Sequence, residues 1–326
     1  MKIFSYEVRF DEVQYLEALK SDKLTIEYTD QILTIDNVEL CRGYDAVNFL
    51  ALSFINKDIL NKLHEFGIKY IATRSVGYNH IDMDHARKLG IKVCNASYPP
   101  TSVAEYTVML ILMVLRNYKQ SLYRGNINDY SLIGLGGRTL KSLTIGVVGT
   151  GKIGATVANL LKGFGCKIFA YDPYENKALN DVVTYTTLEE IYEKSDIITL
   201  HVPYFKENYH MISDNEISKM KKGVIIINAA RGELISNKAL INGIESGHIG
   251  GLGLDAVDGE YGLIHIDHKL DILKNQEIAY LKQFPNVTIT PHIAFYTDDA
   301  TKNMVEIATR GLIAFLETGH CDYEIK

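Results

Sequence analysis

The chain has 326 residues, of which 47% are hydrophobic and 23% are charged. This composition is typical of a globular protein, and the length is sufficient for two domains. The formal net charge of −6 and the pI of about 5.9 argue against a nucleic-acid-binding surface, which requires clustered Lys and Arg.

The longest apolar stretch, Tyr106–Leu115, is shorter than the roughly 20 residues of a membrane span. The amino terminus lacks the basic and apolar regions of a signal peptide, so we expect a cytoplasmic protein without membrane or nucleic-acid partners. The four cysteines, Cys41, Cys94, Cys166 and Cys321, lie far apart and form no C-x-x-C pair. The sequence therefore supports neither a disulfide framework nor a zinc site, and no metal is expected.

The amino-terminal part alternates short apolar runs with helix-like segments. The helix-like segments include Asp11–Leu19 and Ile59–Phe66. This alternation predicts an α/β unit with a mostly parallel sheet. The candidate strands are Lys2–Tyr6, Leu24–Tyr28, Ala46–Leu50, Tyr70–Thr73 and Lys92–Asn95.

A long apolar helix is predicted over Ser102–Lys119, after Pro99 and Pro100. Thr101 or Ser102 is the expected cap, with Glu105 in the first turn. Apolar residues cover more than one side of this helix. We therefore expect it to be buried between domains or between subunits.

The second half contains six candidate strands, the number that a complete doubly wound dinucleotide-binding domain uses. The helical run Asp298–Leu316 that follows them is too short to fold alone, so we expect it to pack on the amino-terminal unit. The expected domains are 1–99 with 297–326, and 100–296. The six strands are Leu143–Val148, Lys167–Tyr171, Ile197–His201, Val224–Asn228, Gly253–Val257 and Val287–Thr290.

A glycine-rich turn separates the first of these strands from a helix predicted over Lys152–Phe164. It reads Gly149-Thr150-Gly151-Lys152-Ile153-Gly154, and Asp172 closes the next apolar run, 23 positions after Gly149. Such glycines allow a tight turn and close backbone approach, the helix amino terminus attracts a pyrophosphate, and the carboxylate accepts ribose hydroxyls. In this complete context the motif predicts an NAD site rather than an ordinary turn.

Ionisable residues follow the ends of these strands, where ligands bind in open α/β sheets. Arg231 offers a planar fork that matches a carboxylate, His292 is a natural proton donor, and Glu260 would favour the protonated imidazole. Each residue alone has an ordinary structural explanation, but together they favour an active site for reduction of a 2-oxo acid. His201 is the rival acid, although with Val202 and Pro203 it is expected to line the cofactor cleft.

Six motifs in order carry a resemblance to a known family. Through them the chain resembles the NAD-dependent D-2-hydroxyacid dehydrogenases over essentially its whole length. Within that family it is similar to the D-lactate and D-2-hydroxyisocaproate enzymes and to the D-lactate dehydrogenases of vancomycin resistance. The motifs are the glycine turn and residues 74–82, 98–105, 228–232, 254–260 and 290–297.

The resemblance implies two doubly wound parallel-sheet α/β domains, with a Rossmann NAD domain inserted in a discontinuous flavodoxin-like substrate domain. It implies that Arg231 holds the substrate, that His292 donates the proton, and that Glu260 hydrogen-bonds His292. The backbone amides of Val76 and Gly77 would receive the substrate carboxylate, and Tyr98 would stand at the pocket mouth. Asp172 would bind the ribose, and Asp255, Ala229 and Ala230 would lie near the cofactor. Relatives form a two-fold dimer through the helix at 102–119, so a homodimer is expected.

Departures from the family pattern bear on the substrate. Leu50 stands near a position where several D-lactate enzymes carry a tyrosine, whereas Phe295 and Tyr296 still crowd the pocket. We expect pyruvate to be reduced to D-lactate, with a larger 2-oxo acid, as in the D-2-hydroxyisocaproate enzymes, as the alternative. A third possibility is an NADH-sensing corepressor, but such proteins usually add tails that this sequence does not show.

Overall fold

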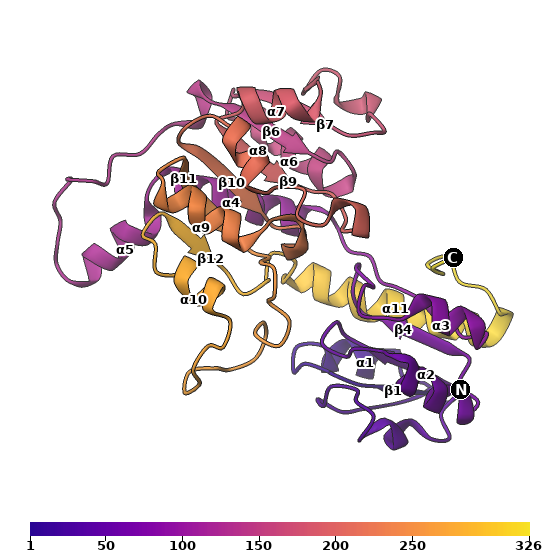
Figure 1. Cartoon of the computed structure of the whole chain (residues 1–326). Helices are drawn as coiled ribbons and strands as arrows, with labels where there is room; N and C mark the ends of the chain where they lie inside the picture. The colour runs from indigo at the N-terminus through magenta and orange to yellow at the C-terminus, as the bar shows by residue number, and fades with distance from the viewer. The chain divides into compact units, whose positions relative to one another are not determined.

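A computed structural model describes residues 1–326, which form two compact α/β units. Unit 1 comprises Met1–Pro99 and Tyr296–Lys326, and unit 2 comprises Pro100–Phe295. Both sheets are entirely parallel, which confirms the predicted fold class. Figure 1 shows the chain coloured from one end to the other, with the carboxy-terminal helix α11 (Asp298–Thr318) beside the amino-terminal elements of unit 1.

Unit 1 has a five-stranded sheet in the order β2-β1-β3-β4-β5. Each strand falls on one of the predicted apolar runs, so the alternation of strands and helices in this part is confirmed. The strands are β1 (Lys2–Ser5), β2 (Thr25–Tyr28), β3 (Ala46–Phe49), β4 (Tyr70–Thr73) and β5 (Lys92–Cys94).

Helices cover both faces of this sheet. The Tyr70 ring of β4 stacks on Phe315 of α11, with 5.2 Å between ring centroids. The next residue, Ile71, joins the core that contains Leu60 and Leu63 of α2 (Lys57–Glu65). Because successive strand residues point to opposite faces, α11 and α2 lie on opposite sides of the sheet. The other helices of the unit are α1 (Val13–Leu19), α2 (Lys57–Glu65) and α3 (Met83–Lys88).

Unit 2 has a seven-stranded sheet in the order β12-β11-β10-β9-β6-β7-β8. The strand order reverses direction between β6 and β9, and this is the switch point at which open α/β sheets bind ligands. Five strands fall on predicted runs. The strand predicted over Gly253–Val257 is placed too late, because β11 ends at Leu254 and shares only two residues with that run. Strand β8 was missed because two residues are too few to show a pattern. The strands are β6 (Thr144–Val148), β7 (Lys167–Tyr171), β8 (Thr184–Tyr185), β9 (Ile197–Leu200), β10 (Val224–Asn228), β11 (Ile249–Leu254) and β12 (Val287–Ile289).

The single helix predicted over Ser102–Lys119 begins within one residue of its expected start, but its predicted cap and its carboxyl end are wrong. Helix α4 spans Thr101–Leu115, and Pro100 rather than a Thr or Ser side chain occupies the capping position. Asn117 adopts a left-handed φ of 50°, which ends the helical path and begins α5 (Tyr118–Asn126). The many-sided apolar character of α4 is explained within unit 2, because α4 packs on α6 (Lys152–Lys162) and on β10, β11 and β12.

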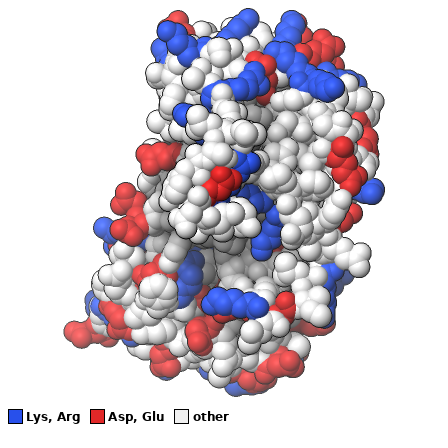
Figure 2. All heavy atoms as spheres, turned by 90° about the vertical axis from the view of Figure 1, so that its left-hand side faces the viewer, with Lys and Arg blue, Asp and Glu red and all other residues white.

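The remaining helices of unit 2 pack around its sheet, and α5 with the loop after it projects away from them (Figure 1). These helices are α6 (Lys152–Lys162), α7 (Leu188–Lys194), α8 (Asp214–Lys219), α9 (Asn237–Glu245) and α10 (Gln276–Leu281). None of the chain's helices combines the length and apolar character that crossing a membrane requires. Figure 2 shows Lys and Arg interspersed with Asp and Glu on the face it displays.

Candidate active site

The glycine turn between β6 and α6 has the close packing that its sequence predicts. A Cβ atom on Gly149, whose φ is 93°, would come within 2.7 Å of the His201 carbonyl oxygen, and one on Gly154 within 2.0 Å of the Gly149 oxygen. A Cβ on Gly151 would meet nothing within 4 Å. The first and third glycines are therefore required by packing, whereas the second keeps the backbone open at the amino end of α6, as a pyrophosphate requires. These features fit NAD.

Asp172 lies directly after β7 and is joined to the glycine turn. Its Oδ2 accepts hydrogen bonds from the Thr150 N–H at 2.6 Å and from the Thr150 hydroxyl at 3.2 Å. The Tyr185 hydroxyl donates to the same threonine oxygen at 3.0 Å. Beside Asp172 is a hollow that three further carboxylates line, so a bound phosphate ester would be repelled there. Its lining residues are Tyr171, Asp172, Glu175, Tyr185, Thr186, Thr187, Leu188, Glu189 and Glu190.

His201 lies behind the glycine turn. Its Nε2 pairs with the Thr199 hydroxyl at 3.0 Å, and removal of the ring from water lowers the pKa of His201 to about 3. A neutral imidazole at physiological pH cannot serve as the proton donor, so His201 is a poor rival to His292. The neighbouring Val202 also borders the turn, since its Cγ1 would lie 2.8 Å from a Gly149 Cβ. Pro203, the next residue, is exposed.

His292 and Glu260 form the hydrogen-bonded pair that the sequence predicts. The Nδ1 of His292 lies 2.6 Å from Glu260 Oε1, and Glu260 Oε2 accepts the Val257 N–H at 2.8 Å. Burial alone lowers the pKa of His292, but the hydrogen bond and charge of Glu260 outweigh burial, so the net shift is upward. His292 has a left-handed φ of 55°, a strained backbone for a residue with a side chain.

Asp255 holds the segment that carries His292. It is almost fully buried after β11, and its Oδ1 accepts the Thr290 hydroxyl at 2.6 Å and the Ile293 N–H at 3.0 Å. Its Oδ2 accepts the Ala294 N–H at 2.8 Å. These three hydrogen bonds bracket His292 and oppose relaxation of its strained backbone.

Arg231 follows β10 at a tight turn. The Asn228 side chain forms this turn by accepting the Ala230 N–H at 3.1 Å and donating to the Arg231 carbonyl at 2.8 Å. The positive charge of Arg231 opposes the upward pKa shift of His292, so the two side chains are near enough to interact. Ala229 and Ala230 are partly exposed on the same turn. Unit 2 thus brings together Arg231, Glu260 and His292, the three residues predicted to be catalytic.

The predicted substrate residues are divided between the units. Leu50 is buried, Gly77 and Tyr98 are partly buried, and Val76 is 40% exposed, all in unit 1. Unit 1 also contains Tyr296, whose ring lies 5.1 Å from the Arg9 guanidinium carbon. Phe295 belongs to unit 2, where its ring contacts that of His265 at 6.1 Å.

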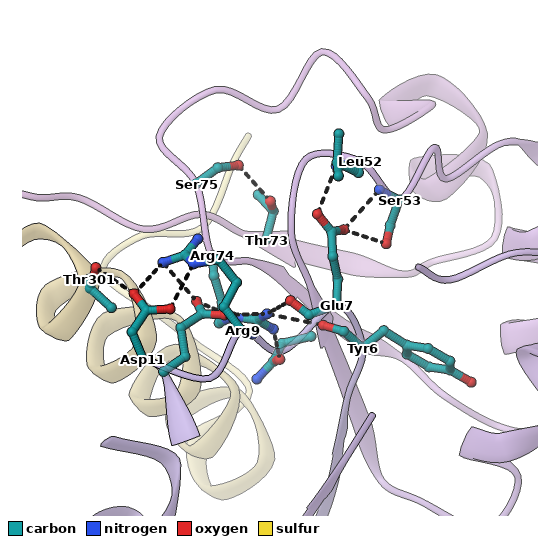
Figure 3. Close-up of polar contacts among 12 residues, drawn as sticks. Tyr6, Glu7, Arg9, Asp11, Leu52, Ser53, Thr73, Arg74, Ser75 and Thr301 are labelled. Carbon is teal, nitrogen blue, oxygen red and sulfur yellow. Dashed lines mark hydrogen bonds and ion pairs between the residues drawn. The ribbon is translucent and has the colours of Figure 1, made fainter. Parts of the chain in front are cut away.

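A buried ionic network precedes the Val76–Gly77 loop and was not foreseen from the sequence. Arg74 is fully buried after β4 and donates to Glu12 Oε1 at 3.0 Å and to Asn48 Oδ1 at 2.5 Å. It also donates to the backbone oxygens of Tyr6 and Glu7. Figure 3 shows Arg74 beside Tyr6, Glu7 and Arg9 of the segment that follows β1. A charged residue directly after a buried strand was the available signal, but its partners are distant in sequence.

A second set of hydrogen bonds holds the same loop from within. The Thr73 hydroxyl pairs with the Ser75 hydroxyl at 2.7 Å and with His80 Nε2 at 3.0 Å. The Ser75 hydroxyl also donates to the Gly77 carbonyl at 2.7 Å. Asn95 Nδ2, just after β5, donates to the Val76 carbonyl at 2.8 Å. The loop is therefore preorganised by side chains on both sides of it.

Comparison with known proteins identifies similar chains. Residues 108–294 match the family described as D-isomer specific 2-hydroxyacid dehydrogenase, NAD binding domain. The chain is 44% identical to an aromatic 2-oxoacid reductase of Clostridium sporogenes over 98% of both chains. It is 36% identical to a D-lactate/D-glycerate dehydrogenase of Pediococcus acidilactici over 100% of this chain and 99% of that one. A solved D-2-hydroxyisocaproate dehydrogenase matches with a TM-score of 0.88 and 35% identity, over 100% and 99% of the two chains.

Proposed function

Because the chain belongs to the family of D-isomer specific 2-hydroxyacid dehydrogenases, we propose that it reduces pyruvate to D-lactate with NADH, with His292 as the proton donor. Its membership makes the protein an NAD-dependent oxidoreductase acting on 2-hydroxy and 2-oxo acids. The observation that carries the proposed role of His292 is its 2.6 Å hydrogen bond to Glu260, with the raised pKa that results.

The glycine turn and Asp172 would hold NADH, which would supply the hydride for reduction of the 2-oxo carbon. Arg231 binds the carboxylate and orients the carbonyl through its planar fork. His292 is protonated at neutral pH and donates from Nε2 to the carbonyl oxygen, while Nδ1–H donates to Glu260. Asp255 keeps the imidazole in position through the hydrogen bonds that hold residues 290–294.

The Val76–Gly77 loop is the proposed second contact for the substrate carboxylate. Support comes from its rigidity, because Arg74 fixes its start and Ser75 and Asn95 fix its carbonyl groups. A preorganised loop loses little conformational entropy when it binds a ligand. Tyr98 is proposed to stand beside the same carboxylate.

A second candidate substrate is an aromatic 2-oxo acid. The relative that is 44% identical over almost the full chain is named an aromatic 2-oxoacid reductase, whereas the relative named for D-lactate and D-glycerate is 36% identical. Leu50 in place of a bulky tyrosine would also leave room for a larger side chain. Each additional buried methylene would contribute roughly 0.8 kcal/mol to binding.

A spectrophotometric assay of NADH oxidation tests both candidates. We expect the highest kcat/KM for pyruvate, lower values for 2-oxobutyrate, and slower turnover of 2-oxoisocaproate and phenylpyruvate. A tenfold preference for phenylpyruvate, or about 1.4 kcal/mol, would establish the second candidate instead. NADH binding without oxidation by any of these acids would overturn the enzymatic proposal and favour an NADH sensor.

The substitution Leu50→Tyr tests whether the residue at position 50 limits the size of the substrate side chain. A tyrosine there should reduce kcat/KM for 2-oxoisocaproate and phenylpyruvate more than for pyruvate, because it fills space that only larger substrates use. Kinetics with the full panel measure this, and Leu40→Tyr, at a residue 47% exposed, is the matched control. Equal losses for all substrates would remove Leu50 from the pocket.

The proposal also includes a cytoplasmic homodimer. The four free cysteines support a reducing compartment. Exposed apolar side chains on α5 and the loop after it support burial against a second copy, because monomeric surfaces rarely expose such clusters. These side chains are Leu122, Tyr123, Ile127, Tyr130, Leu132 and Ile133.

A further inference from the structure

Two cysteines far apart in the sequence meet at the edge of unit 1. Cys94, the last residue of β5, is fully buried, and Cys321 is partly exposed in the segment after α11. A Cβ atom on Gly311 of α11 would come within 2.8 Å of Cys94 Sγ and 3.0 Å of Cys321 Sγ. The two sulfur atoms thus occupy the same small space, which exists because residue 311 has no side chain. Each thiol is the other's hydrogen-bond partner.

Backbone pairing keeps these cysteines together. Cys94 forms an antiparallel bridge with Glu324, the Asn95 N–H donates to the Tyr323 carbonyl, and the Ile325 N–H donates to the Val93 carbonyl. The carboxy-terminal segment therefore pairs with the outer edge of β5 through an isolated antiparallel bridge. This pairing brings Cys321 to Cys94 before any covalent bond exists.

The environments of the two thiols differ in the way that disulfide exchange requires. The hydrogen bond from Cys94, helped by the Tyr323 N–H, lowers the pKa of Cys321 to about 7. The interaction with Cys321, together with burial, raises the pKa of Cys94. Cys321 is thus the exposed, readily ionised nucleophile, and Cys94 is a protected thiol beside it. Cys41 and Cys166 instead donate to backbone carbonyls, of Val38 and Leu161 respectively.

We propose that Cys94 and Cys321 form a redox modification site, at which a low-molecular-weight disulfide such as oxidised glutathione converts the two thiols into one intramolecular disulfide. The Cys321 thiolate attacks one sulfur of the oxidant, forms a mixed disulfide and releases one thiol. Cys94 then loses its proton, attacks the Cys321 sulfur and releases the second thiol. The protein gives up two electrons and two protons, and the oxidant is reduced to two thiols.

Thiol counting on the full chain tests this site. The reduced protein contains four cysteines, and treatment with oxidised glutathione should leave two free thiols after unfolding, with no retained glutathione. A non-reducing peptide map should then join the peptide of Cys94 to that of Cys321. Four remaining thiols, or a disulfide that links two chains, would overturn the proposal. This measurement needs no variant, so it does not depend on any substitution folding.

Single substitutions assign the order of the steps. Cys94→Ala should stop the reaction at a glutathione adduct on Cys321, and Cys321→Ser should leave Cys94 unreacted. Cys166→Ser is the matched control, which should still lose two thiols. Loss of two thiols in Cys321→Ser at the wild-type rate would contradict the assignment of the nucleophile.

The proposed disulfide should also hold the carboxy-terminal segment against β5. Hydrogen exchange of the peptide that contains Tyr323 and Ile325 should be slower in the oxidised protein than in the reduced protein, because the pairing can then no longer open freely. The Cys94→Ala variant, treated in the same way, should show no such slowing. Equal exchange in oxidised and reduced wild-type protein would contradict a fastening role.

Discussion

The pKa of a single residue, His292, sets the pH range in which the proposed reaction can run. Glu260 raises this pKa, so the imidazole stays protonated to a higher pH than an ordinary histidine. Reduction needs the protonated form and is therefore lost as the pH rises through the raised pKa. Oxidation of the hydroxy acid needs the neutral imidazole, so its rate should instead increase as the pH rises through the same pKa.

Replacement of Glu260 by Gln should lower the pH at which reduction activity is lost. The amide keeps a hydrogen-bond acceptor but removes the negative charge, so burial would then dominate the pKa of His292. The measurement is kcat/KM for pyruvate across about pH 5 to 10. Glu277→Gln, at a residue in the first turn of α10, is the control. A reduction profile that is unchanged by Glu260→Gln would show that the pair is not catalytic.

A second prediction for a single residue concerns the contribution of Arg74 to stability. Arg74→Met leaves the fully buried Glu12 with only the backbone N–H of Arg9 and a longer, 3.8 Å ion pair to the Arg9 guanidinium, which should cost about 3 kcal/mol of unfolding free energy. Denaturant unfolding measures the loss. Arg42→Met removes an exposed ion pair with Glu39 and should change stability by less than about 1 kcal/mol. Similar small losses of unfolding free energy in both variants would mean that the buried Arg74–Glu12 ion pair contributes little to the stability of unit 1.

At the level of elements, two glycines of the glycine turn have different roles. Gly154 is required for packing, whereas Gly151 leaves space for a ligand. Gly154→Ala places a methyl group against the Gly149 oxygen, so it should destabilise the protein by about 1–3 kcal/mol. Gly151→Ala meets no protein atom within 4 Å and should leave stability nearly unchanged. It should weaken NADH binding, because the methyl group occupies space through which the pyrophosphate approaches the backbone.

Thermal melting and NADH titration of the two variants check this separation. Near wild-type melting of Gly151→Ala with wild-type NADH affinity would show that the cofactor does not approach this backbone. Strong destabilisation of Gly151→Ala would show that the space beside it is not open.

Elements that depend on local pattern could be predicted from the sequence. Runs such as Val224–Asn228 became strands because β-branched apolar residues fill a sheet that is covered on both faces. The end of α4 could not be predicted, because no Pro or Gly directly follows Leu115 to stop the helix and only the left-handed backbone of Asn117 breaks it. The local residues allow both conformations, and tertiary packing selects one.

The residues of the candidate site also divide into those that a local sequence pattern predicts and those that it does not. Arg231, Glu260 and His292 could be found because each follows a strand within a short motif. The Arg74–Glu12 pair and the Cys94–Cys321 pair could not, since their partners come from distant segments of unit 1. Large sequence separation hides such contacts from any pattern that is read along the chain.

For the whole molecule, the prediction is a homodimer. Light scattering at micromolar concentration should report twice the chain mass of 36.7 kDa. Replacing the exposed Leu132 and Ile133 with Asp should shift the mass toward that of one chain, because a charge would have to be buried. Substitution of Phe10, 88% exposed in unit 1, with Asp is the control. A particle of one chain mass in the wild type would contradict the prediction.

The discontinuity of unit 1 has a consequence for biosynthesis. Helix α11 packs against β3, β4 and β5, yet the ribosome makes it only after all of unit 2. Until it emerges, the face of the unit 1 sheet over β3, β4 and β5 lacks this helix, and the nascent chain carries the exposed apolar surface while unit 2 folds as a continuous segment. The first domain to be synthesised is thus the last to be completed.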